Sequence, residues 1–346
     1  MWGCVRSCDG LSWNNRTFYV TANVPYSCEA ARGVARCKYI TPEPIDIQAV
    51  WRSTVKSPTT EIVKPILLIV TAIVALGSIV AHADAIDTEH LFGFTIGTDI
   101  GEVGEKEFES NTLSRLGKRS GSYSALSQSL SLEYTAVQNL RLEVSATGVY
   151  YDIVGVPGLD DRRQGAFDGL SFDMRYRILD RAHAPFGLMI DAEPHWGRVD
   201  EVSGDPVDRY GVDLALVADK ELVPNRIVAA FNLLYLPESA RSRVTGIWSR
   251  QATIGVATAL MAQIGPDLFV GTEARYLRSY EGLGFDNFAG HGFFVGPTIY
   301  ANLSERSWIL FAWNVQIAGR SADDPGPLDL KNFERHQATL KFGFTF

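Results

Sequence analysis

The residue pattern with the clearest chemical potential is Asp191-x-Glu193-x-His195, three ionisable side chains separated by Ala192 and Pro194. Alternate residues of an extended strand point to the same face, so these three groups would share one surface. A histidine beside two carboxylates can act as a general base, and a carboxylate-imidazole set can bind a cation. The same triple also forms an ordinary salt-bridged network on a polar strand face, and we favour this interpretation.

Other catalytic and metal-binding patterns are missing from the sequence. No Gly-x-Ser-x-Gly nucleophile motif occurs, and no serine stands with a suitably placed histidine. The cysteines lack the paired Cys-x-x-Cys spacing of zinc sites, and all precede residue 38: Cys4, Cys8, Cys28 and Cys37. We therefore predict no catalytic residue, no metal site and no cofactor, with a hydrolase as a minor alternative.

The elements that would position the ionisable groups are strand-length segments in which apolar and polar residues alternate. In Ala125–Tyr134, for example, Leu126, Leu130 and Leu132 oppose serines. Twelve such segments follow one another from residue 86 onward, and this repetition predicts a membrane β-barrel rather than a soluble sheet. They are Leu91–Thr98, Ala125–Tyr134, Leu140–Tyr151, Leu170–Ile178, Phe186–Gly197, Tyr210–Ala218, Ile227–Leu236, Trp248–Leu260, Leu268–Leu277, Phe293–Leu303, Ile309–Ile317 and Ala338–Phe346.

The connections between these segments alternate in length. Long links are expected at residues 100–123, 152–169, 198–209, 237–247, 278–292 and 318–337, and tight ones at 135–139, 180–185, 223–226, 265–267 and 304–307. Outer-membrane barrels have long extracellular loops and short periplasmic turns. The sequence thus predicts an all-β, closed antiparallel transmembrane barrel of about 12 strands. Pro194 and Pro297 lie inside strands and predict local bulges.

The last segment ends on an aromatic residue after alternating apolar positions, Leu340, Phe342, Phe344 and Phe346. This end resembles the closing strand of Gram-negative outer-membrane β-barrels, which the barrel-assembly machinery reads. The resemblance implies an outer-membrane location and that machinery as a partner. In fold and size the chain also resembles small monomeric transport barrels, although no motif of a specific family can be placed residue by residue.

The residues before the barrel divide into two predicted parts. Ile66–Val80 is apolar, too short to span a bilayer comfortably, and is followed by small residues at alternate positions, which predicts a signal peptide over residues 55–85. Residues 1–54 show no strand or helix periodicity, and we interpret them as a non-structural leader or a gene-start artefact, with a genuine extended leader as the alternative. The barrel then occupies residues 86–346.

Composition agrees with a membrane barrel and argues against nucleic-acid partners. Hydrophobic residues make up 46% of the chain and charged residues 21%, as expected where only alternate residues face lipid. The net charge is −8, and removing residues 1–85, with eight Lys/Arg and six Asp/Glu, leaves −10. Such an acidic protein does not bind nucleic acid through basic patches.

The alternation also assigns residues to the two faces of the wall. The inward face is expected to line the lumen with both signs of charge: Glu133, Arg141, Glu143, Asp173, Arg175, Arg177, Asp191, Glu193, His195, Asp213, Glu273, Arg275 and Lys341. Aromatic residues on the outward face next to the long links predict a membrane girdle, because amphipathic rings prefer the headgroup level. They are Tyr150, Trp196, Tyr210, Tyr235, Trp248 and Tyr276.

Three functions are compatible with this pattern. The first is a passive channel or porin for small polar or ionic solutes, in which the lumen charges bias permeation. The second is a non-conducting structural barrel, or one that binds partners through its loops. The third is an outer-membrane hydrolase. Outer-membrane lipid and lipopolysaccharide are expected partners, since acidic loops can bridge to phosphates through divalent cations.

Overall fold

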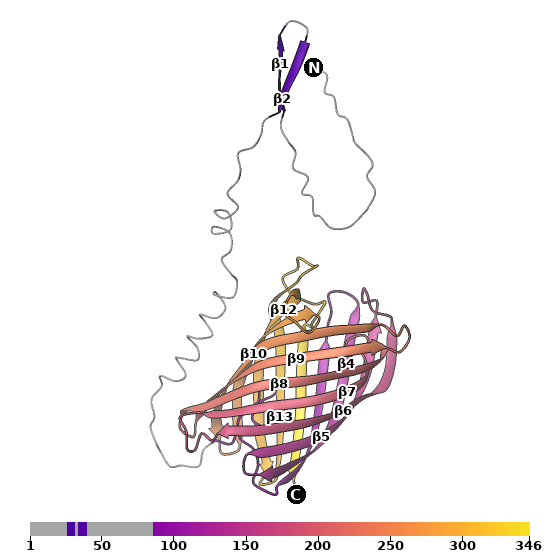
Figure 1. The fold of residues 1–346 in the computed structure, drawn as a ribbon. Coiled ribbons are helices and arrows are strands. Elements are labelled where there is room, and N and C mark those ends of the chain that lie inside the picture. Colours follow the sequence, from indigo (N-terminus) through magenta and orange to yellow (C-terminus); the bar gives the residue numbers. More distant parts are fainter. Residues whose placement is uncertain (1–25, 32–33, 40–85) are drawn as a thin grey trace. The chain divides into compact units, whose positions relative to one another are not determined.

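The computed structural model describes residues 26–31, 34–39 and 86–346, and the chain divides into two compact units, Met1–Thr71 and Ala72–Phe346. In the first unit, β1 (Tyr26–Ala31) and β2 (Val34–Tyr39) form a two-stranded antiparallel sheet (Figure 1). The predicted leader, residues 1–54, contains these two strands, and its interpretation as a leader or gene-start artefact stays a prediction. The predicted signal peptide, residues 55–85, lies outside the described residues.

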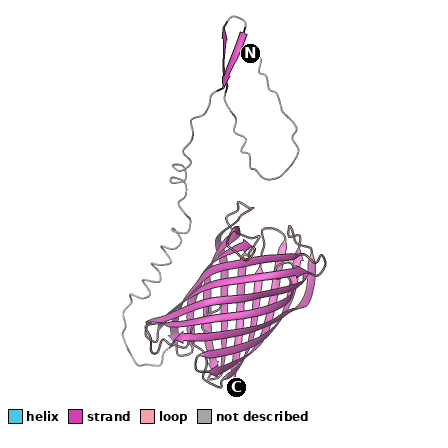
Figure 2. Cartoon of the chain, viewed as in Figure 1, coloured by secondary structure: helices cyan, strands magenta, loops and turns pink. Residues whose placement is uncertain are grey.

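The second unit contains a closed barrel, as Figure 2 shows. This barrel has twelve strands. Each strand pairs antiparallel with its neighbours in the chain, and the last strand pairs with the first, so the sheet has no free edge. The strands are β3 (Lys106–Leu116), β4 (Ser122–Val137), β5 (Leu140–Val154), β6 (Arg162–Leu179), β7 (Gly187–Val199), β8 (Pro206–Val223), β9 (Ile227–Ser242), β10 (Trp248–Gly265), β11 (Leu268–Glu281), β12 (Asn287–Ser304), β13 (Ser307–Ser321) and β14 (His336–Thr345).

The two faces of the wall differ as the alternation predicts. Large apolar side chains such as Leu132, Phe172 and Phe311 are exposed on the outer face, whereas charged residues such as Glu133 and Asp173 are buried in the lumen. Apolar side chains outside and charged side chains inside suit a sheet whose outer surface meets lipid. Closure of the barrel also satisfies the backbone hydrogen bonds, which lipid cannot do. Among the described residues, no helix is long and apolar enough to span a membrane.

The first strand of the barrel differs from the prediction. Leu91–Thr98 was expected to form it, but those residues are not in a strand, and β3 instead begins at Lys106, inside the predicted first loop. The apolar residues of Leu91–Thr98 pack inside the barrel, so their alternation reflects contact with the inner wall and not with lipid. On β3 four of the six outward positions are polar, and only Phe108 and Leu116 are apolar, so the lipid signal is weak. Gln128 of β4 hydrogen-bonds Ser110 and Thr112 there and satisfies these groups.

The observed strands also run further than predicted, which shortens the loops. One end of the barrel, called the turn end, has links 138–139, 180–186, 224–226, 266–267 and 305–306 and carries the C-terminus; the other, the loop end, has links 117–121, 155–161, 200–205, 243–247, 282–286 and 322–335. The prediction of bulges at Pro194 and Pro297 is wrong. Ladder pairs are missing beside both prolines, but the register is the same before and after each.

Candidate functional site

Residues 86–105, called here the inserted segment, enter the barrel and contact opposite parts of its wall, and residues 102–104 are exposed. Ile86 N donates to Glu221 of β8 at 2.5 Å, and Gly93 N donates to Glu273 of β11 at 2.7 Å. His90 stacks on Trp308 of β13 with ring centroids 4.4 Å apart. Since these strands lie far apart around the wall, the segment crosses the lumen.

Three buried polar side chains of the wall hold the backbone of the inserted segment. Glu273 accepts hydrogen bonds from Gly93 N at 2.7 Å and Phe94 N at 2.8 Å, and Asp219 accepts one from Thr98 N at 2.8 Å. Asn232 makes two bonds to Ile96, accepting from its N–H at 2.7 Å and donating to its carbonyl at 2.9 Å. The wall thus satisfies a buried, irregular backbone that has no strand partner.

Apolar contacts anchor the same segment on the β9–β11 side of the barrel. Leu91 and Phe92 pack with Val228, Met261 and Phe269, all buried. Removing such side chains from water provides most of the packing free energy of a core. On the lumen side of β11, Arg275 places its guanidinium 4.0 Å from the centre of the Phe94 ring.

Arg181, in the link 180–186, closes the inserted segment at the turn end. Its guanidinium donates to the Ile86 carbonyl and to Asp99, and its Nη1 lies 3.1 Å from Asp219 Oδ2. Burial raises the pKa of Asp99 above its ordinary value, although the Arg181 charge acts in the opposite direction. Arg181 therefore joins both ends of the segment to β8.

Arg141 is the centre of a buried ionic cluster beside the inserted segment. Its guanidinium lies 2.6 Å from Glu133, 2.9 Å from Glu143 and 3.2 Å from Glu89. Burial lowers the pKa of His90, the neighbour of Glu89, more than the surrounding carboxylates raise it. Glu89, His90 and Glu133 form the one potential metal-ligand group among the described residues, but both of its carboxylates already pair with Arg141.

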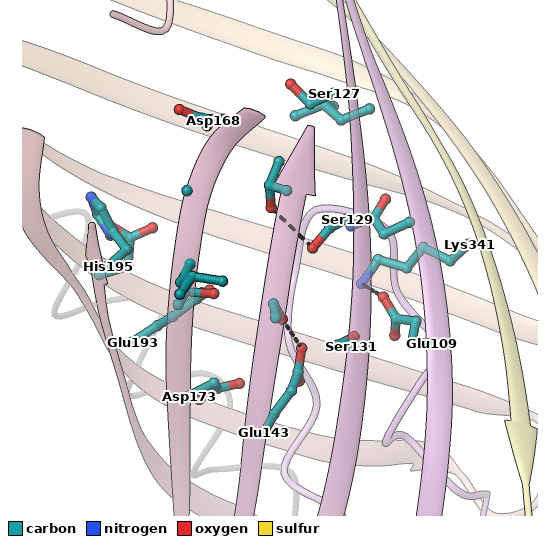
Figure 3. Close-up of a pocket in the computed structure, with 18 of the residues that line it drawn as sticks. Glu109, Ser127, Ser129, Ser131, Glu143, Asp168, Asp173, Glu193, His195 and Lys341 are labelled. Carbon is teal, nitrogen blue, oxygen red and sulfur yellow. Dashed lines mark hydrogen bonds and ion pairs between the residues drawn. The ribbon is translucent and has the colours of Figure 1, made fainter. Parts of the chain in front are cut away.

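A polar cavity of about 320 Å³ lies between the inserted segment and the strands β3 to β8. Figure 3 shows Glu109, Ser129, Glu143, Glu193 and His195 around it. Serine and threonine hydroxyls of β4, β5 and β6 form much of one wall: Ser127, Ser129, Ser131, Ser145, Thr147 and Ser171. Lys341 reaches into the cavity from β14, 3.7 Å from Glu109.

The strand register aligns carboxylates across the wall of this cavity. Glu133 of β4 is opposite Glu143 of β5, which is opposite Asp173 of β6. Glu193 of β7 is likewise opposite Asp213 of β8. Like charges directly opposite each other are destabilising unless neutralised. Arg141 and Arg175 pair with the first three and reduce this repulsion, with Arg175 Nε 3.0 Å from Asp173.

Two links at the loop end fold over the lumen. Glu201, in link 200–205, pairs with Arg209 of β8 and lies 3.1 Å from Arg115 of β3. In link 322–335, Glu334 lies 3.1 Å from Lys118. Burial alone would raise the pKa of Glu334, but the charges of Lys118 and Arg115 outweigh it and lower that pKa. Loops thus narrow the mouth that faces the cavity.

The structure separates the residues of the Asp191-x-Glu193-x-His195 pattern. Asp191 lies 3.9 Å from Arg175, whereas His195 lies 3.8 Å from Asp213 and 3.7 Å from Glu238. Glu193 lines the cavity. Apart from Asp191, which pairs with Arg175, the expected inward residues fall into four groups: the Arg141 cluster, the cavity wall, the residues holding the inserted segment (Glu273, Arg275), and Arg177, 3.8 Å from Asp99 at the turn end.

The residues assigned to the outer face lie where the alternation puts them. Tyr210 is 51% exposed, Trp248 is 52% exposed, and Trp196 is the direct cross-strand neighbour of Tyr210. Tyr150 is also exposed, and Tyr235 and Tyr276 are half-buried. All four C-terminal residues of the predicted assembly signal, Leu340, Phe342, Phe344 and Phe346, are exposed on the outer face. Their roles as girdle and signal stay predictions.

Sequence reasoning missed the residues that depend on the inserted segment. Asn232 carried a signal, because it is the single polar residue in the apolar run Ile227–Leu236. Asp219 and Arg181 carried none, since each falls just outside a predicted strand. Glu107 and Glu109 were assigned to a loop, yet they face the lumen on β3, where Glu107 accepts a hydrogen bond from Trp308.

The barrel with its inserted segment corresponds to a known protein family. The family model described as "Family of unknown function (DUF6662)" matches residues 84–346. The chain belongs to this family. A search of the curated proteins found no match. The matched residues take in the inserted segment and all twelve strands of the barrel, so both are part of the family's shared region.

Solved structures with a similar fold are outer-membrane barrels. The COG4313 outer membrane channel from Pseudomonas putida F1 is 14% identical with a TM-score of 0.50, over 72% of this chain and 98% of that one. The translocator domain of autotransporter NalP from Neisseria meningitidis is 10% identical with a TM-score of 0.45, over 72% of this chain and 91% of that one. The Ralstonia pickettii toluene transporter TbuX is 11% identical with a TM-score of 0.34, over 75% of this chain and 97% of that one. The chain has the fold of a Gram-negative outer-membrane barrel, and this fold supports an outer-membrane location.

Proposed function

We propose that this protein is a passive outer-membrane channel for small polar or ionic solutes, held closed by the inserted segment. The observation that carries the proposal is the polar cavity of about 320 Å³ inside the barrel wall. A barrel that served only as a scaffold would be stabilised by filling this space, because empty or water-filled volume forfeits packing contacts. A hydroxyl- and charge-lined space instead suits a hydrated solute.

The closure is built to be reversible. The part of the inserted segment inside the lumen is held by hydrogen bonds and ion pairs to the side chains of Asp219, Asn232, Glu273 and Arg181 and by apolar contacts, not by strand pairing. Segments without ladder hydrogen bonds open locally at lower free energy than the strands around them. Displacing residues 86–105 would connect the cavity with the turn end, which we place in the periplasm.

Conductance in planar bilayers tests this proposal. The wild-type chain should show rare, small steps, whereas Arg181→Met should show frequent and larger ones, because it removes the bonds from the guanidinium to Ile86, Asp99 and Asp219. The control Arg320→Gln changes an exposed arginine that does not touch the segment and should behave as wild type. Absence of steps in both the wild type and Arg181→Met would refute the channel.

A non-conducting structural barrel is the second candidate. It is favoured by the inserted segment, which reaches from β8 to β13, and by the Arg141 cluster beside it. If these contacts are permanent, the amide protons of residues 86–105 should exchange as slowly as those of the strands, and Arg181→Met should not conduct.

The proposal includes export through a cleaved signal peptide and assembly through the C-terminal aromatic residues. Protein recovered from the outer-membrane fraction should begin after Ala83 or Ala85. Deleting Phe346 should lower the amount of assembled barrel, because the outward aromatic row of β14 loses its end. An N-terminus upstream of residue 55 in the assembled protein would contradict the predicted cleavage.

A further inference from the structure

We propose that the cavity between β3 and β8 binds a small organic ammonium ion, with Glu193 and Asp213 as its charged ligands. The inference names the class of solute for the proposed channel. It rests on the proposed function only because both use the same cavity. It starts from an electrostatic imbalance. Glu193 and Asp213 are direct cross-strand partners, and both line the cavity.

Neither carboxylate forms an ion pair with Lys or Arg in the part of the chain that the structure describes. The nearest basic group is His195, whose Nδ1 lies 3.8 Å from Asp213 Oδ1. Two carboxylates directly opposite each other on neighbouring strands repel. A cation bound from the cavity removes this repulsion, as Arg141 does for Glu133 and Glu143 on neighbouring strands of the same wall.

A second, independent observation comes from Asp173, which also lines the cavity. Its side chain is 5% exposed, and its Oδ2 lies 3.0 Å from Arg175 Nε. Its Oδ1 is buried and accepts no hydrogen bond from an amine, guanidinium or hydroxyl group of the described residues; its neighbour is the carboxyl group of Asp191. Asp191 can donate to this oxygen only through a carboxyl proton, so an N–H group of a bound cation is an alternative donor for it.

The whole lining of the cavity has more acidic than basic side chains, as the Glu193–Asp213 pair does. Eight carboxylates line the cavity against four side chains of Lys or Arg, and the two histidines add charge only when protonated. The carboxylates are Glu89, Glu109, Glu143, Asp168, Asp173, Glu193, Glu201 and Asp213, and the cations are Arg115, Arg175, Arg209 and Lys341. Carboxylate-rich linings of this kind favour cations over anions.

The geometry favours an ammonium ion over a bare metal ion. No third His, Cys, Asp or Glu comes close enough to Glu193 and Asp213 to complete a metal-sized ligand set among the described residues. An ammonium group needs no such closure, because its separate N–H donors can each reach a different acceptor. The hydroxyls of Ser145 and Ser171 provide further polar contacts for the rest of a small, hydroxylated molecule.

Titration calorimetry of the refolded full-length chain in detergent at pH 7 tests the inference, with protonated ethanolamine as the probe. We expect heat of binding for the wild type and affinity at least tenfold weaker for the double variant Glu193→Gln, Asp213→Asn, equivalent to about 1.4 kcal/mol. Each single variant should give an intermediate loss, which keeps the test valid if the double variant folds poorly. Ethylene glycol, of similar size but uncharged, should not bind.

Glu305→Gln is the matched control, because it removes one carboxylate in an exposed turn outside the cavity. Equal affinity in the wild type and the Glu193 and Asp213 variants, or no binding to the wild type, overturns the inference. Its failure is distinguishable from failure of the channel. Conducting barrels without ethanolamine binding refute the ligand only, whereas ethanolamine binding that needs Glu193 and Asp213 in a barrel that never conducts refutes the channel only.

Discussion

Glu273→Gln tests whether wall side chains hold the inserted segment. In the wild type, Glu273 Oε1 accepts from Gly93 N at 2.7 Å and from Thr298 Oγ1 at 2.6 Å, while Oε2 accepts from Phe94 N at 2.8 Å. Glutamine has nearly the same shape but offers one oxygen and one NH₂ group. Whichever way the amide is turned, an NH₂ donor then faces a backbone donor of the segment.

The size of this effect follows from the contacts. Glu273 is fully buried, and a buried backbone N–H without an acceptor costs about 1–3 kcal/mol, while the remaining bonds lose their charge assistance. We expect docking of the segment to weaken by about 2–4 kcal/mol in total. At 1.36 kcal/mol per factor of ten, the open population rises about 30- to 900-fold.

Hydrogen exchange followed by mass spectrometry measures this change directly. Peptides from residues 86–105 should exchange faster in Glu273→Gln, while peptides from β4 and β5 should not change. The control Glu238→Gln alters another inward carboxylate of the barrel, which contacts Arg209 and Gln251 but not the segment. Unchanged exchange of residues 86–105 in a correctly folded Glu273→Gln protein would show that the segment is not held in this way.

Three further predictions concern stability and closure. Arg141→Met leaves Glu133 and its neighbours unpaired in the lumen and should lower the free energy of unfolding by about 3–5 kcal/mol, measured by urea denaturation in detergent. Gly97→Ala should speed exchange of the inserted segment, because the added Cβ would lie 2.1 Å from a backbone oxygen within it; normal exchange would contradict this packing. Because the pKa of Glu334 is lowered in the folded protein, its pair with Lys118 stabilises link 322–335 at neutral pH. This stabilisation is lost as the pH falls from 4.5 through the lower pKa of the folded state. Hydrogen exchange of the link should therefore rise over that pH range in the wild type and should not depend on pH in this way in Glu334→Gln.

The sequence by itself determined the class of fold and the direction in which most side chains face. Ser171 and Phe172 are neighbours in the chain, yet one lines the cavity and the other is exposed on the outer face, and period-2 alternation alone predicts this. Strand ends were less predictable, because a strand can continue past the lipid after the apolar alternation has stopped, as β9 does from Pro237 through Ser242.

Only the tertiary structure decided what fills the barrel. Phe92, Phe94 and Ile96 show the same alternation as a membrane strand, but they pack against the inner wall, while β3 crosses with mainly polar outward residues. Alternation reports that one face is apolar and does not report whether lipid or protein covers it. The partners of Glu273, and the lack of Lys or Arg beside Glu193 and Asp213, depend on strand register and on contacts across the lumen, and these exist only once the sheet has closed.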